Sequence, residues 1–183
     1  MNKSDKERLV LLKKANRLGM ILPRYLNRLS EIEPEFERAG ILDAIQIDKM
    51  RIELNASNRE TILIKRSPKS KPSTIQEILK VLKNELGRVN YFSIDKLKEL
   101  WFAELNTSFL IENFEKVIDI DGDLFIVHDK ELKNGLWLDL NEEYWTTENV
   151  TNYEFIYELK IWGSTWTDLL VNFKRKTRSI TRD

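Results

Sequence analysis

The N-terminal third of the chain carries a helical pattern of apolar positions. Between residues 4 and 32, apolar side chains recur in steps of three and four, the spacing of one face of an α-helix. Gly19 and Pro23 interrupt this pattern, so the sequence predicts two shorter helices rather than one. A third helix is expected near Glu33-Pro34, followed by a β-hairpin over residues 50–65.

The apolar stripe of residues 11–32 has two interpretations. Its spacing fits about three heptads of an a/d seam, which would make it a dimerising coiled coil. Ordinary packing of a helical pair gives the same pattern, and this is the interpretation that we favour. The stripe consists of Leu11, Ala15, Leu18, Leu22, Tyr25, Leu29 and Ile32.

The middle of the chain predicts three helices followed by a hairpin. The first helix is expected over residues 74–86, with Gly87 as its C-terminal stop. The second is expected over residues 94–105 and a short third over residues 107–115. Residues 117–127 alternate on both sides of an Asp-Gly dipeptide, which favours a tight hairpin turn.

The C-terminal third predicts two strands and a closing helix. Residues 135–140 and 153–162 have the apolar pattern of strands, with a helix as the open alternative for 153–162, and residues 166–176 follow a helix-start signal. Three tryptophans fall in this region, and their large side chains are expected to close a core. They are Trp145, Trp162 and Trp166.

These elements predict an α+β protein built from small units. The expected units are a basic N-terminal unit of helices and a hairpin (residues 1–66), a module over residues 74–128, and a mixed β/α C-terminal extension with a basic tail (residues 129–183). Residues 67–73 are rich in proline, serine and lysine and form the expected linker.

The order of elements over residues 74–128 resembles a winged helix-turn-helix. Gly87-Arg88-Val89, Phe114 and the Asp121-Gly122 turn are similar to features of the LOTUS and HARE winged-helix modules. The resemblance implies a winged-helix-like fold that binds nucleic acid or protein, and the N-terminal third is open to the same interpretation as a second, looser module. Residues 107–116, the expected major-groove helix, hold a single cation, so protein binding or internal packing of this module is favoured over the reading of bases.

Composition excludes several classes of chemistry. The chain has no cysteine and one histidine, which excludes disulfides, thiolate metal sites and multi-histidine metal sites. That histidine, His128, is expected at a strand end on the surface. The chain contains neither an apolar run long enough to span a membrane nor a signal peptide, so a cytoplasmic protein without membrane contact is expected.

The charges are balanced in number but unevenly placed. Residues 1–72 hold 16 basic and 10 acidic residues, residues 172–183 hold 5 and 1, and the stretch between is acidic. This favours either nucleic-acid contact by the basic ends or head-to-tail electrostatic pairing, with solvated faces as the plain alternative. The candidate nucleic-acid contacts are Arg24, Arg28, Arg59, Lys65, Arg66, Lys69, Lys71, Lys174, Arg175, Lys176 and Arg178.

One pattern points to an enzyme. Glu158-Leu159-Lys160 lies in a predicted strand, which places the carboxylate and the amine on one face. It resembles the acid-x-Lys half of the PD-(D/E)xK nuclease motif, with Asp139 as a usable partner. The resemblance implies that Asp139 and Glu158 hold Mg²⁺ while Lys160 assists the attacking water. A salt-bridged, solvated strand face explains the same residues and is favoured.

The favoured function is a non-enzymatic, nucleic-acid-associated regulator that uses the basic N-terminal unit and tail and needs no cofactor. The first alternative is a protein-interaction or assembly factor that binds a protein partner or forms an oligomer. It would act through the stripe of residues 11–32 or the module of residues 74–128. A Mg²⁺-dependent nuclease is the second alternative.

Overall fold

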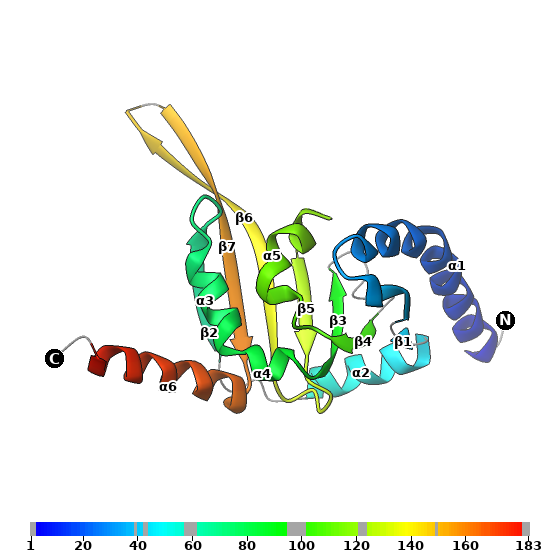
Figure 1. The fold of residues 1–183 in the computed structure, drawn as a ribbon. Coiled ribbons are helices and arrows are strands. Elements are labelled where there is room, and N and C mark those ends of the chain that lie inside the picture. The colour runs from blue at the N-terminus through cyan, green and yellow to red at the C-terminus, as the bar shows by residue number, and fades with distance from the viewer. Residues whose placement is uncertain are drawn as a thin grey trace.

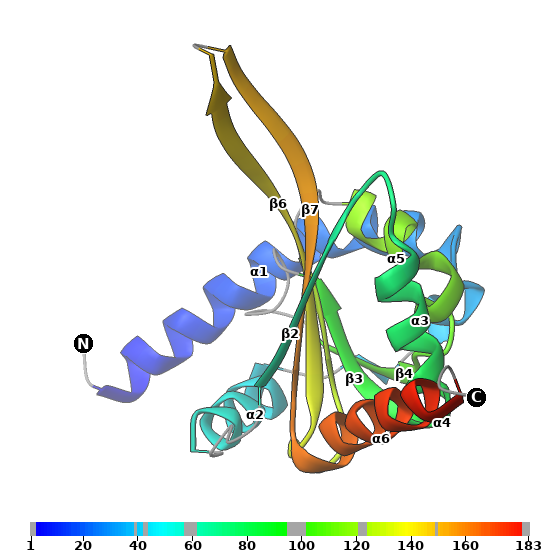
Figure 2. The same ribbon diagram turned by 90° about the vertical axis from the view of Figure 1, so that its left-hand side faces the viewer.

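A computed structural model describes residues 3–38, 40–41, 44–56, 62–94, 102–120, 124–148 and 150–180, and Figure 1 shows their fold. Its centre is one antiparallel sheet of seven strands in the order β1-β4-β3-β5-β6-β7-β2. Helices lie on both sides of this sheet (Figure 2). The combination confirms the expected α+β class. Within the described residues, none of the helices combines the length and the apolar character needed to cross a membrane.

The described part of the chain forms six α-helices, one 3₁₀ helix and seven strands. In chain order these are α1 (Lys3–Ser30), η1 (Pro34–Arg38), β1 (Gly40–Ile41), α2 (Ala44–Ala56), β2 (Ile62–Pro68), α3 (Ser73–Val81), α4 (Lys83–Leu86), β3 (Val89–Ile94), β4 (Ala103–Asn106), α5 (Leu110–Asp119), β5 (Leu124–His128), β6 (Gly135–Thr147), β7 (Val150–Trp162) and α6 (Ser164–Ile180).

The main core lies between the sheet and the helices α3 and α5. The buried residues of both helices recur at helical spacing, which places them on one face. They are Ile75, Ile78 and Leu79 on α3 and Leu110, Ile111, Phe114, Val117 and Ile118 on α5. These side chains belong to the same core as Phe125, Leu138 and Leu159 of the sheet, which are fully buried. Burial of each such side chain contributes about 1.5–3 kcal/mol to folding.

Helix α1 is continuous, whereas the sequence predicts two shorter helices. Pro23 lies inside it, and an internal proline costs about 3 kcal/mol because it removes a hydrogen bond and crowds the preceding turn. Burial offsets this cost, since Leu22 and Leu26 pack against the main core on either side of the proline and Leu29 is fully buried. Core packing of the apolar stripe is therefore confirmed from Leu18 onward.

Helix α2 packs on the opposite side of the sheet from α3 and α5 (Figure 2). Ile47 and Met50 are buried with Phe102 and Leu132 in a second, smaller core. The predicted hairpin over residues 50–65 is therefore wrong, because its first half lies within α2 and β2 pairs with β7 instead. A short alternating run fits a helix or a strand locally, and the burial of two residues three positions apart favours the helix.

The predicted order of three helices and a hairpin is not found where the structure describes residues 74–128. The first predicted helix is present as α3 and α4, and Gly87 caps its end. At the two ends of the span predicted for the second helix, Ile94 ends β3 and residues 103–106 form β4. Residues 117–119 are the last turn of α5, so the first strand of the predicted hairpin is also wrong.

The second predicted strand of that hairpin is present as β5, but its partners are distant in sequence. β5 pairs with β3 on one side and with β6 on the other. Local alternation predicts a strand without identifying its partner, which explains the wrong topology. The Asp121-Gly122 turn and residues 95–101 lie outside the described residues. The winged-helix order is therefore not found in the described part of residues 74–128.

The sheet crosses the predicted boundaries between units. Residues 67–73, the predicted linker, form the end of β2, a turn and the start of α3. In that turn the Ser67 hydroxyl donates a 2.6 Å hydrogen bond to the Lys71 carbonyl oxygen. Because β2 pairs with β7 and β5 pairs with β6, strands from all three predicted units share one sheet.

The predicted elements of the C-terminal third are confirmed. β6 includes the predicted strand 135–140, β7 includes 153–162, and α6 includes the closing helix 166–176. His128, in contrast, is 3% exposed and not on the surface. It lies between the rings of Phe102 and Trp162, because β5 is an interior strand with neighbours on both sides.

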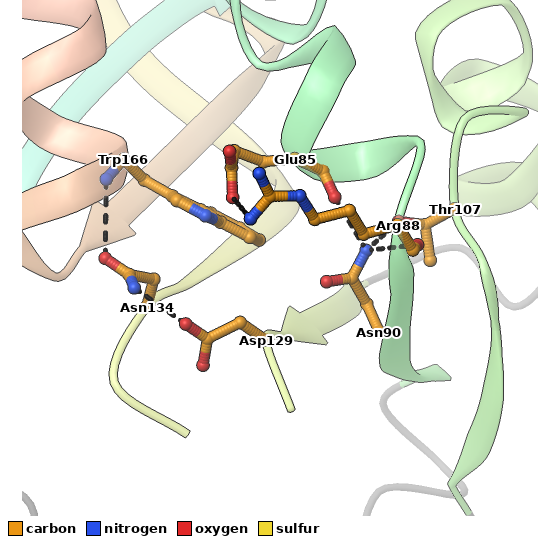
Figure 3. Close-up of polar contacts among 7 residues, drawn as sticks. All are labelled: Glu85, Arg88, Asn90, Thr107, Asp129, Asn134 and Trp166. Atoms are coloured by element: carbon orange, nitrogen blue, oxygen red, sulfur yellow. Dashed lines mark hydrogen bonds and ion pairs between the residues drawn. The ribbon is translucent and has the colours of Figure 1, made fainter. Parts of the chain in front are cut away.

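Buried asparagines fix two loops against the sheet (Figure 3). The Asn134 amide donates to the Asp129 carboxylate at 2.7 Å, and its oxygen accepts the backbone N–H of Trp166 at 3.3 Å. This pair of bonds holds the start of α6 against the loop between β5 and β6. Asn90 acts in the same way between α4 and β4, where its partners are Glu85, Arg88 and Thr107.

Candidate functional site

The strands β6 and β7 extend beyond the rest of the sheet as a two-stranded projection (Figures 1 and 2). They pair along all 13 residues of each strand, up to Thr147 opposite Val150. Their neighbours end earlier, since β5 pairs with β6 only as far as Asp139 and β2 pairs with β7 only as far as Ile156. We call residues 141–155 the arm.

The arm exposes four large aromatic side chains. Tyr144 and Tyr153 lie opposite each other and are 63% and 61% exposed, and Phe155, on the same face, is 37% exposed. Their rings form a ladder, with centroids 6.2 Å apart between the tyrosines and 6.0 Å apart between Tyr153 and Phe155. Trp145 projects from the other face and is 47% exposed, so its predicted place in a core is wrong.

The arm is also strongly acidic. Residues 141–155 contain four glutamates and neither lysine nor arginine. Those glutamates are Glu142, Glu143, Glu148 and Glu154. The Tyr144 hydroxyl donates a hydrogen bond to Glu142, and Arg66 forms an ion pair with Glu143 at the base of the arm. The surface therefore combines aromatic rings with carboxylates, a combination that attracts cationic and apolar groups.

A tight turn closes the arm. Because Thr147 pairs with Val150, only two residues connect the strands. Glu148, the first of these, has a φ of 49°, in the left-handed region that two-residue hairpin turns of type I′ require. A residue other than glycine in this conformation costs about 1 kcal/mol. The register of the two strands is thereby fixed up to the tip.

The apolar pattern of the sequence predicts the strands of the arm but not the exposure of their aromatic side chains. The sequence holds a signal for this exposure, because residues 141–155 consist of polar and aromatic residues and a single aliphatic residue, Val150. A strand of a packed sheet normally buries aliphatic side chains on at least one face. Their near absence over this stretch indicates that neither face is covered.

The predicted nucleic-acid contacts are placed in several separate regions. Arg28 and Lys69 meet at the C-terminal end of α5, where Arg28 donates to the Ile120 and Asp119 carbonyl oxygens and the Lys69 Nζ lies 2.8 Å from the Asp119 carboxylate. Cations at this position complement the negative end of the helix dipole. Both residues therefore have an internal structural role.

The other predicted contacts do not join them. Arg66 forms ion pairs with Glu143 and Glu158, while Lys65, the residue before it in β2, lines a groove between α3 and α6 on the other face. Arg24 and Lys71 are exposed. Arg59 lies outside the described residues, as do the side chains of Lys174, Arg175, Lys176 and Arg178 on α6. The basic N-terminal and C-terminal ends point to opposite sides of the molecule in both views (Figures 1 and 2).

The residues of the nuclease alternative are brought together on the sheet. Asp139 lies opposite Glu158 in the β6–β7 register, and the Lys160 Nζ lies 2.8 Å from the Glu158 carboxylate. Arg66 also reaches Glu158, at 3.3 Å, and Lys160 lies over the ring of Trp137. Within the described part of the chain, no three carboxylate or imidazole groups converge closely enough to hold a metal ion. The arrangement has the contacts of an ion-pair network.

Comparison with known proteins gives no relative to this chain. Among family models, curated proteins and solved structures, no match is found.

Proposed function

We propose that this chain is a protein-interaction or assembly factor and that the arm is the element that binds its partner. The observation that supports this most strongly is the exposed aromatic ladder of Tyr144, Tyr153 and Phe155 on a projecting ribbon. Exposed apolar surface that forms a contiguous patch is typical of interaction sites, whereas scattered exposed residues are not.

The chemistry of the arm defines the partner surface that fits it. Tyrosine and tryptophan are enriched at protein interfaces because they bury a large area, lose little side-chain entropy and keep one polar group. Four glutamates beside them favour a partner with basic residues. A basic and partly apolar protein surface therefore matches the arm, and the phosphates of a nucleic acid do not.

A comparison of three baits in a lysate of the source cells tests this function. The first bait is the unchanged chain, the second is an arm variant with Tyr144→Ser and Tyr153→Ser, and the third is a control with Leu169→Ser and Phe173→Ser on α6, which are also exposed. A zero-length carbodiimide reagent then joins carboxylates to lysines that they contact. We expect crosslinks from arm glutamates to a captured protein in the first and third baits and about a tenfold loss in the second. Equal capture and crosslinking by all three baits would contradict the proposal.

Nucleic-acid binding, the function favoured by the sequence, is the second candidate. The cations of the N-terminal end and the tail support it, because neutralised phosphates supply most of the affinity for nucleic acid. The internal contacts of Arg28, Arg66 and Lys69 count against it. If it is correct, binding of a labelled duplex falls steeply between low and moderate salt, and absence of binding at low salt would exclude it.

The Mg²⁺-dependent nuclease is the third candidate, and the shared face of Asp139, Glu158 and Lys160 favours it. Glu158 would then help to hold the ion, and Lys160 would assist the water. The Glu158 carboxylate is already occupied by ion pairs with Arg66 and Lys160, so we rank the nuclease function last. The test is cleavage of single-stranded or duplex DNA in the presence of Mg²⁺. Loss of this cleavage in Glu158→Gln would support the nuclease function, and unchanged cleavage would contradict it.

A further inference from the structure

We infer that the partner of the arm is the N-terminal segment of α1 in a second copy of this chain. The inference rests on the proposed function and identifies the partner. It makes the assembly head-to-tail, because the two surfaces in contact are different parts of the chain.

The first reason is charge. The arm has four acidic residues and no basic ones, whereas residues 5–17 have five basic residues and two acidic ones. The basic residues are Lys6, Arg8, Lys13, Lys14 and Arg17. Lys14 is 2.9 Å from Asp48 of α2, which ties this end of α1 to the body and limits its freedom. The remaining cations are exposed and available to the carboxylates of an arm.

The second reason is apolar surface. Residues 5–10 of α1 are exposed on every side of the helix. This exposed segment includes the large apolar residues Leu9 and Val10, and Leu12, one turn further on, is exposed as well. The rings of Tyr144 and Tyr153 are exposed in the same way on the arm. Lysine and arginine pack favourably over aromatic rings, and the helix carries these cations beside its apolar residues. The arm supplies aromatic rings and carboxylates, and the helix supplies cations and aliphatic side chains that can pack on them.

The third reason is geometry. Six residues of each strand of the arm span about 20 Å, and residues 5–17 form a helical segment of about the same length. The arm and the first turns of α1 leave the body in different directions (Figures 1 and 2). An arm therefore does not lie on the α1 of its own chain. A second copy supplies the missing surface, and a repeated contact of this kind builds chains or closed rings.

Sedimentation of the purified chain of residues 1–183, from low to several hundred micromolar, tests the inference. A contact between one short helix and one hairpin is small, so we expect association in the micromolar range. The arm variant (Tyr144→Ser, Tyr153→Ser) and an α1 variant (Arg8→Glu, Lys13→Glu) should each weaken association about tenfold or more. High salt should weaken it as well. The α6 control (Leu169→Ser, Phe173→Ser) should associate like the unchanged chain, and circular dichroism should show that all variants keep the fold.

A mixture of the two variants gives the decisive result. The arm variant keeps a usable α1, and the α1 variant keeps a usable arm, so the mixture should form a one-to-one dimer and nothing larger. An α1 variant that still associates by itself would overturn the inference, because the contact would then be arm to arm or use another segment. A chain that stays monomeric at every concentration would also overturn it. If the arm still gives crosslinks to another protein in the lysate, the proposed function stands and only the identity of the partner is wrong.

Discussion

Asp139 of β6 and Glu158 of β7 lie directly opposite each other, so two carboxylates share one cross-strand position near the base of the arm. Like charges in this arrangement destabilise a sheet, and Lys160 and Arg66 offset the repulsion through their ion pairs with Glu158. Burial raises the pKa of the Asp139 carboxyl above its ordinary value, and the Glu158 charge adds to this rise. Hydrogen bonds from Asn141 and Leu140 and the Lys160 ammonium oppose it.

We expect Asp139→Asn to stabilise the protein at neutral pH. A carboxyl with a raised pKa in the folded state favours folding when protonated, and this contribution is lost as the pH rises through that pKa. At pH 7 the charged form therefore opposes folding, and the uncharged amide removes the penalty. The midpoint of urea unfolding should be higher in the variant at pH 7, and the gain should disappear below about pH 4, where unfolded aspartate is also protonated.

An exposed carboxylate on α6 provides the control for this prediction. Asp168→Asn removes the same charge from the surface, so a general effect of net charge would appear in both variants. A gain in both variants, or a gain of Asp139→Asn that persists in acid, would contradict the explanation by burial. Under the nuclease alternative, the same Asp139→Asn variant would gain stability and lose cleavage.

We expect Asn134→Ala to cost about 1–3 kcal/mol of unfolding free energy, the penalty for leaving buried polar groups without partners. The substitution removes the 2.7 Å bond to Asp129 and the acceptor for the Trp166 N–H (Figure 3). Urea unfolding monitored by tryptophan fluorescence measures it. Asn152→Ala on the exposed arm is the matched control and should be close to neutral. Equal losses in the two variants would show that the buried contacts contribute nothing specific.

The elements that the sequence predicts correctly are those with complete local signals. The helix after residue 73, the strand 153–162 and the closing helix each combine a periodic apolar pattern with a start or stop residue nearby. Gly87, for example, caps α4, which follows α3 and ends at the predicted place. Such signals act within one turn or one strand and do not depend on the rest of the fold.

The elements that it predicts wrongly depend on distant contacts. Residues 50–54 alternate like a strand, but Met50 packs on Phe102 and Leu132, which are more than 50 residues away, and the segment is helical. β5 pairs with β3 and β6 and not with the residues before it. No local pattern identifies those partners, so the sequence predicts several small units where the structure has one continuous sheet.

The candidate site was missed for a related reason. The strand pattern predicts that Tyr153 and Phe155 lie on a strand, but their exposure depends on where the neighbouring strands end. β2 pairs with β7 only to Ile156, and this limit follows from the position of Pro68 and the turn after it. Exposure of the arm is therefore a property of the whole sheet.

Two glycines should respond to alanine in opposite ways. Gly163 has a φ of 89°, and a Cβ there would lie 2.3 Å from the Asn134 Oδ1 and 2.4 Å from the Lys133 carbonyl oxygen. Gly163→Ala should cost about 1–3 kcal/mol or more. Gly19 lies within α1, and a Cβ there would meet no neighbouring atom within 4 Å, so Gly19→Ala should add about 0.5–1 kcal/mol. Thermal unfolding of both variants tests the pair, and a shift of the same sign in both would contradict it.

Two buried or partly buried tyrosines offer the sharpest test of the core. Tyr157 is fully buried, with its ring edge against Phe114, and no described residue forms a hydrogen bond with its hydroxyl. Burial raises the pKa of the Tyr157 hydroxyl, with Glu115 and Asp119 adding to the rise. Tyr91 differs, because it is half-buried and lies opposite Glu104 in the β3–β4 register, and burial, with the Glu104 carboxylate adding to the effect, raises the pKa of its hydroxyl.

We therefore expect Tyr157→Phe to leave stability unchanged or to raise it by about 1 kcal/mol, since a buried hydroxyl without a partner opposes folding. Tyr91→Phe removes a hydroxyl beside the partly exposed Glu104 carboxylate and should cost about 0.5–1.5 kcal/mol. Urea unfolding at pH 7 compares the two. A loss in Tyr157→Phe as large as that in Tyr91→Phe would show that the Tyr157 hydroxyl contributes a hydrogen bond to the native state, and that the core around Phe114 is more polar than its contacts indicate.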